Sequence, residues 1–100
     1  MKAYLRFKRC IGRGNLWLYV VSILNRRGPL HGYGIIQELR QLGFGVSTVY
    51  GYVLLKRMVA DGVLKEVEKD GKKLYIATDV AQENFRKALR ELEDLVKRLS

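Results

Sequence analysis

The sequence predicts a mainly α-helical domain with one β-hairpin and a long helix at its C-terminal end. Apolar residues recur at helical spacing in three stretches before residue 61. Two β-rich runs then flank Asp70-Gly71, and an apolar four-three repeat fills residues 79–99. A chain of 100 residues allows one such domain, whose core is thin because short chains bury a small share of their surface.

The first expected helix runs from about residue 16 to Arg27. Asn15 is a good N-cap for it, and Gly28-Pro29 ends it. The helix is apolar nearly all round, so it must be covered on more than one side. A chain of this length offers little cover, which favours a dimer. Residues 1–13 form a basic segment with interspersed apolar residues, and nothing in the sequence fixes its structure.

Two short helices joined by a tight turn are expected next. One runs from about Gly32 to Leu42 and has an apolar and a polar face. Gly43-Phe44-Gly45 makes the turn after it. Ser47 then caps a third helix, which runs to about Ala60 and is closed by Asp61-Gly62. This arrangement is a helix-turn-helix pattern.

The two β-rich runs, from Val63 to Lys69 and from Lys72 to Thr78, are expected to form a hairpin. The Asp70-Gly71 dipeptide between them suits a two-residue turn with positive φ at both positions. Three helices followed by a hairpin is the order of a winged helix-turn-helix domain. We therefore expect residues 14–78 to form one, with the hairpin as its wing.

The last expected helix, within residues 79–100, carries an apolar stripe flanked by charges of both signs. Over some 20 residues it is about 30 Å long, which outreaches a domain of this size. Pairing with a second copy in a homodimer is therefore favoured over packing onto its own domain. The residues expected at the dimer interface come from this helix and from the first one: Leu16, Trp17, Val20, Phe85, Ala88, Leu92, Leu95 and Leu99.

The positive charge is confined to one part of the chain. Residues 1–78 carry 14 Lys and Arg against 5 Asp and Glu, which is the whole net charge of +9, whereas residues 79–100 carry five of each. A basic body joined to a neutral tail predicts one surface that faces a polyanion and one that faces protein. The alternative is a Lys- and Glu-rich surface of the kind found in thermophiles, with no partner implied.

Two elements of the expected fold carry candidate DNA contacts. A recognition helix presents its N-terminal residues to base edges, and here that end holds hydroxyls, with Gly51 allowing close approach; alternatively, Ser47 is only a cap and Tyr50 a packed aromatic. At the hairpin tip Lys69 faces Lys72, which is unfavourable unless an anion lies there, although lysines also protect exposed strand edges. The residues expected to contact DNA are Tyr33, Ser47, Thr48, Tyr50, Tyr52, Lys56, Arg57, Lys69, Lys72 and Lys73.

No motif indicates an enzyme, a cofactor or a metal site. Cys10 has no second cysteine to pair with, and the lone His31 is typical of a loop histidine. The apolar run at residues 16–21 follows basic residues as in a secretory signal, but no small-residue cleavage site follows it. The run is also too short to cross a bilayer, which needs about 20 residues. A cytoplasmic protein without membrane contact is expected.

Three stretches resemble the PadR-like transcriptional regulators. Residues 28–35, Gly-Pro-Leu-His-Gly-Tyr-Gly-Ile, resemble the Gly-Pro…Gly-Tyr-x-Ile signature of that family. Residues 52–58 with 61–64 resemble its Tyr-x-x-Leu-Lys-Arg-Leu…Gly-Leu run, and residues 74–78 resemble its Tyr-x-Leu-Thr strand. Where the family has Pro-Gly-Thr-Leu, this chain has Thr48-Val49-Tyr50-Gly51, so Tyr50 and Tyr52 are both candidates for the family tyrosine.

The resemblance covers residue 14 to about 99 and implies a dimeric winged-helix repressor, often responsive to a small-molecule effector. It also implies dimerisation through the C-terminal helix packed with the first helix, as in the shorter subgroup that has a single C-terminal helix. We therefore expect a regulator that binds a two-fold symmetric operator in double-stranded DNA. Two other functions stay open: a protein-interaction module, and a sequence-independent architectural binder, which the basic residues 1–13 suggest.

Overall fold

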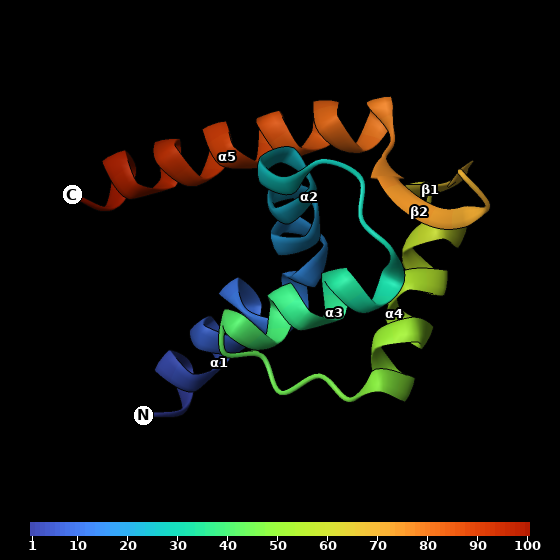
Figure 1. Ribbon diagram of the computed structural model, residues 1–100. Helices are drawn as coiled ribbons and strands as arrows, with labels where there is room; N and C mark the ends of the chain where they lie inside the picture. Colours follow the sequence, from blue (N-terminus) through green and yellow to red (C-terminus); the bar gives the residue numbers. More distant parts are fainter.

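The computed structural model describes residues 1–100 and confirms a mainly helical fold with a two-stranded wing and a long C-terminal helix (Figure 1). None of the helices combines the length and the apolar character that crossing a bilayer requires. In chain order the elements are α1 (Lys2–Ile11), a 3₁₀ turn η1 (Arg13–Asn15), α2 (Leu16–Arg27), α3 (Gly32–Gln41), α4 (Thr48–Ala60), β1 (Leu64–Lys69), β2 (Lys72–Ala77) and α5 (Asp79–Leu99).

Helix α1 lies in the segment for which the sequence predicted no structure. Its N-cap residue makes no side-chain hydrogen bond, and no acidic residue lies in its first turn. Its C-terminal end is instead fixed from outside: the Tyr19 hydroxyl donates a hydrogen bond to the Ile11 carbonyl, and the Asn15 side chain donates one to the Cys10 carbonyl. Asn15 therefore occupies the N-cap position of α2 without capping it, contrary to expectation, because its amide is engaged with α1.

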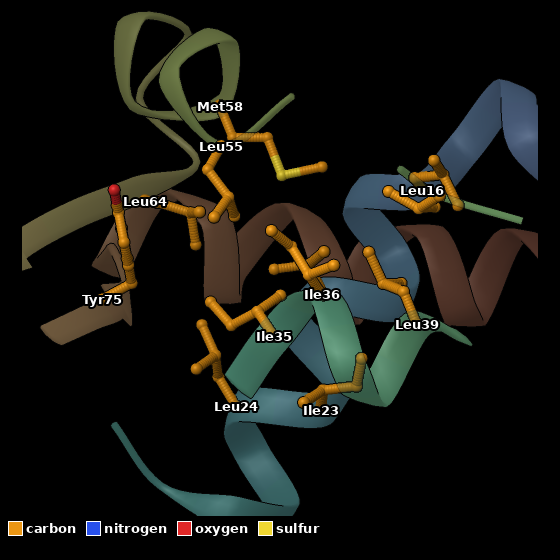
Figure 2. Packing of buried hydrophobic residues seen from close by; sticks show 12 residues of the cluster. Leu16, Ile23, Leu24, Ile35, Ile36, Leu39, Leu55, Met58, Leu64 and Tyr75 are labelled. Atoms are coloured by element: carbon orange, nitrogen blue, oxygen red, sulfur yellow. The ribbon is translucent and has the colours of Figure 1, made fainter. Parts of the chain in front are cut away.

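The core lies where α2, α3 and α4 meet the hairpin (Figure 2). Only 16 of the 100 residues are buried, none of them polar or charged, so the core is as thin as the chain length predicts. Leu16 and Val20 belong to it, with 3% and 0% of their surface exposed. This corrects their expected place at a dimer interface, because both side chains already pack in the core of the single chain.

Helices α3 and α4 pack closely at Gly51. A Cβ atom placed there would lie 2.5 Å from both Cγ1 and Cδ1 of Ile36, a side chain with no exposed surface. Gly51 is itself buried. Its lack of a side chain thus allows α3 to approach α4, and not, as expected from the sequence, α4 to approach DNA.

The hairpin has the expected register. Lys69 pairs with Lys72 and Glu68 with Lys73, and the turn residues Asp70 and Gly71 have φ values of 55° and 74°. Leu30 forms an isolated antiparallel bridge with Tyr75 of β2, in which Tyr75 N–H donates a hydrogen bond to Leu30 O at 2.7 Å. This bridge joins the wing to the segment that leads into α3. Burial raises the pKa of the Tyr75 phenol above its usual 10.0, because the anionic form loses hydration.

Helix α5 is attached to the rest of the fold through its first turn. The Thr78 hydroxyl accepts a hydrogen bond from Ala81 N–H at 3.1 Å, and Ala81 is buried. The Asn25 and Gln82 side chains exchange hydrogen bonds of 3.2 and 2.6 Å between α2 and α5. Beyond residue 90 every residue is exposed, and the helix projects away from the core (Figure 1).

Candidate nucleic-acid interface

The N-terminal half of α4 presents polar and aromatic side chains to solvent. Ser47 Oγ accepts a hydrogen bond from Tyr50 N–H at 3.1 Å, so Ser47 is the cap of this helix. Leu55 and Met58 point into the core. Thr48, Tyr50, Lys56 and Arg57 are exposed, as expected for a helix that reads DNA.

The two candidate tyrosines of α4 are similarly exposed, and the ring of Tyr52 has a defined neighbour. The Tyr52 ring packs on the first turn of α3: its Cε1 lies 2.7 Å from the position that a Cβ atom on Gly32 would take. Only a glycine at position 32 leaves room for that ring. Tyr50 and Tyr52 are 36% and 40% exposed, so both rings can be reached by a ligand.

Two of the three wing lysines are free of carboxylates. Lys73 Nζ forms an ion pair with Glu66 Oε1 at 3.2 Å, and not with Glu68, the residue opposite it in the register. The hydrogen bond to Glu66 is the main reason that the pKa of Lys73 lies above its usual 10.5. Lys69 and Lys72, which flank the turn, form no ion pair. The positive charge of the wing tip therefore comes mainly from these two residues.

Few positive charges are neutralised anywhere on the surface. Three ion pairs form, Arg27–Glu38, Lys73–Glu66 and Lys87–Glu83, so three of the 19 Lys and Arg side chains have a carboxylate partner. Glu38 is the only acidic residue among the first 60. The surface formed by α1, the α3–α4 turn and α4 therefore carries basic side chains and no acidic ones, which attracts polyanions.

An apolar groove lies between α1, α2 and α5. Its volume is about 520 Å³. The groove brings together residues expected at the dimer interface, Phe85, Leu92 and Leu95, with two residues of α1 that the sequence did not single out, Phe7 and Ile11. Of the other expected interface residues, Trp17 packs against the core, Ala88 is half-buried, and Leu99 is 78% exposed at the end of α5.

Comparisons with known proteins agree with this geometry. The family model described as the transcriptional regulator PadR-like family matches residues 20–87. No curated protein matches the chain.

Solved structures resemble the chain in fold at low sequence identity. A PadR family transcriptional regulator from Eggerthella lenta is 24% identical, with a TM-score of 0.66 over 99% of this chain and 94% of that one. A transcriptional regulator from Clostridium thermocellum is 21% identical, with a TM-score of 0.67 over 87% of each chain. F93 from STIV, a winged-helix DNA-binding protein, is 20% identical, with a TM-score of 0.66 over 84% of this chain and 92% of that one.

Proposed function

We propose a specific function for this chain, which belongs to the transcriptional regulator PadR-like family: it binds a two-fold symmetric operator in double-stranded DNA as a homodimer and represses transcription by occupying that site. One observation carries the proposal. Helix α4 and the hairpin lie along one edge of the molecule (Figure 1), and the hairpin turn is flanked by the unpaired Lys69 and Lys72. A single duplex can contact both elements at once.

In this proposal α4 enters the major groove and the wing contacts the backbone. Thr48 and Tyr50 lie where a recognition helix meets base edges, and hydroxyls both donate and accept hydrogen bonds there. Lys69 and Lys72 lie on flanking phosphates, which position the protein without reading sequence. Tyr33, 46% exposed on α3, and Lys56 and Arg57 on α4 are further candidates for backbone contacts.

The proposed dimer uses the groove between α1, α2 and α5. The leucines of α5 that line or adjoin the groove are 43–49% exposed at Leu89, Leu92 and Leu95. An apolar helix face of this kind, from a chain with a thin core, is stabilised when a second copy covers it. Two-fold symmetry then sets two α4 helices about 34–36 Å apart, one turn of DNA. The effector that the family resemblance implies, and the cytoplasmic location, stay predictions.

Selection of bound duplexes from a random pool tests sequence-specific binding. We expect an enriched motif with two related half-sites. Retained affinity without any enriched motif would instead favour a sequence-independent architectural binder. Failure to shift any duplex at low salt would contradict the proposal and favour a protein-interaction module.

Removing the wing charges is expected to weaken the salt dependence of DNA binding. The double variant Lys69→Ala, Lys72→Ala loses two phosphate contacts, so the slope of log K against log salt falls by about 2. Lys73→Ala alone has a smaller effect, because Glu66 already neutralises Lys73. Titrations with labelled duplex over a salt series measure the slope. The matched control is Arg26→Ala, Lys97→Ala, which removes two exposed charges elsewhere; an equal slope in both double variants would exclude the wing from the interface.

A further inference from the structure

We propose that Arg13 and Arg40 form a second phosphate-binding site, at the turn between α3 and α4. This site binds a phosphodiester of the duplex, orients Thr48, and extends the contact surface from α4 towards α1. The inference rests on the DNA binding proposed above and adds a pair of residues to it that no sequence motif indicated.

Arg40 is held in place by the turn that leads into α4. Its Nε donates to the Val46 carbonyl at 2.8 Å, and its Nη2 donates to Thr48 Oγ1 at 3.0 Å. The guanidinium carbon lies 5.9 Å from the centre of the Tyr33 ring. A planar cation held at several points is already ordered before a ligand arrives, so binding costs little side-chain entropy.

Arg13 reaches the same turn from η1. Its Nη2 donates to the Gly45 carbonyl at 2.7 Å. Since Gly45 precedes Val46, the two guanidinium groups bind successive carbonyls of one turn, although they come from η1 and α3. The turn runs from the α1 side of the molecule to the first residues of α4 (Figure 1).

Neither arginine has a carboxylate partner. All three ion pairs of the chain lie elsewhere, and Glu38, the one acidic residue before residue 61, is paired with Arg27 at 2.8 Å. Two positive side chains at neighbouring carbonyls of one turn raise the local electrostatic potential and favour an anion beside them. Both residues are exposed, so the anion can come from solvent or from a bound polymer.

The free hydrogen-bond donors fit a phosphodiester. Each guanidinium has five N–H groups, of which Arg40 uses two and Arg13 one in the contacts above. The remaining donors are of the kind that binds phosphate oxygens in pairs. Thr48 Oγ1 accepts from Arg40, which leaves its own proton to donate. Arg40 is thus also a positioning residue for Thr48, a candidate base contact.

The test compares charge-removing variants of the full chain on the selected duplex. Arg13→Gln and Arg40→Gln are each expected to lower the salt slope by about 1, the loss of one phosphate contact. The matched control, Arg26→Gln, removes an exposed arginine at the end of α2 and is expected to keep the wild-type slope. If the slopes of Arg13→Gln and Arg40→Gln equal that of Arg26→Gln, the inference is wrong. If these variants had a lower melting temperature but the wild-type salt slope, both arginines would have a structural role only, and the inference would again be wrong.

Arg40→Lys separates charge from position. The lysine keeps the positive charge, so the salt slope is unchanged. Its ammonium cannot donate to the Val46 carbonyl and to Thr48 Oγ1 in the planar geometry of the guanidinium, so affinity for the selected duplex falls relative to random duplex. In the Arg40→Lys background, Thr48→Val is expected to cost less affinity than in the wild type; equal costs would contradict the positioning role. If the wild type binds no duplex, the proposed function fails. If the wild type and the wing variant behave as predicted but the Arg13 and Arg40 variants keep the wild-type slope, the proposed function stands and this inference is wrong.

Discussion

Replacing Leu92 and Leu95 together by glutamate is expected to convert the protein to monomers and to weaken operator binding by about 10²–10⁴-fold. Both leucines line the groove between α1, α2 and α5 and are 44% and 49% exposed in the single chain. In the proposed dimer they are covered by the second copy, where unpaired carboxylates are costly. A monomer has one α4 helix for DNA, so it loses the gain from binding two linked half-sites.

Light scattering after size exclusion measures the mass, and a gel shift measures the affinity. Val80→Glu is the matched control, because Val80 lies on the same helix, is 63% exposed and does not line the groove. It is expected to keep both the dimer and the affinity. A wild-type protein that elutes at 11.5 kDa at micromolar concentration would contradict the proposed dimer.

Gly51→Ala is expected to lower the free energy of unfolding by about 1–2 kcal/mol. The new methyl group meets Ile36 at 2.5 Å, and overpacking of this kind costs about 1–3 kcal/mol. The higher helix propensity of alanine offsets up to about 1 kcal/mol of that. Because a change of 1 kcal/mol shifts the melting temperature of a small domain by about 4–8 °C, a thermal melt resolves the effect.

Gly34→Ala provides the control for Gly51→Ala. Gly34 also lies in a helix, but an added Cβ would meet nothing nearer than 3.7 Å, so only the gain in helix propensity remains and the melting temperature rises. The two Gly-to-Ala changes thus have opposite signs. If Gly51→Ala raised the melting temperature and weakened DNA binding, Gly51 would face DNA, as the sequence alone suggested.

The elements set by short-range signals could be predicted from the sequence. A two-residue hairpin turn needs a positive φ at both of its residues, and Asp-Gly is a dipeptide that adopts this conformation readily. Asp70-Gly71 therefore marks the turn, and the position of the turn sets the register of the two strands. Ser47 similarly marks the first residue before α4, because its hydroxyl can satisfy a free backbone N–H of the first turn. In both cases residues within three positions of each other decide the geometry.

What the sequence could not show depends on residues far apart in the chain. Helix α1 has no capping signal, and its end is fixed by Tyr19 and Asn15 from later elements. Because α2 is apolar on all sides, the sequence predicted that it is covered but could not show which of its residues the same chain buries. Leu16 and Val20 were for this reason expected at the dimer interface, whereas they lie in the core.

The turn arginines could have been found only indirectly. Arg13 and Arg40 bind neutral carbonyls, which leave no pattern in the sequence. The sequence offered one indication, the absence of acidic residues between residues 39 and 60, which leaves no carboxylate close in sequence on the C-terminal side of Arg40.

The attachment of α5 determines more than the position of one helix. The side-chain hydrogen bonds that join α5 and its N-cap to the head involve Thr78 and Gln82, whereas the whole helix of 21 residues is about 30 Å long at 1.5 Å per residue. In the proposed dimer we expect the angle between α5 and the head, which the Asn25–Gln82 amide pair helps to fix, to set the separation of the two α4 helices. Changing that pair would then alter the spacing of the half-sites that the protein accepts, while the residues of α4 that face DNA stay the same.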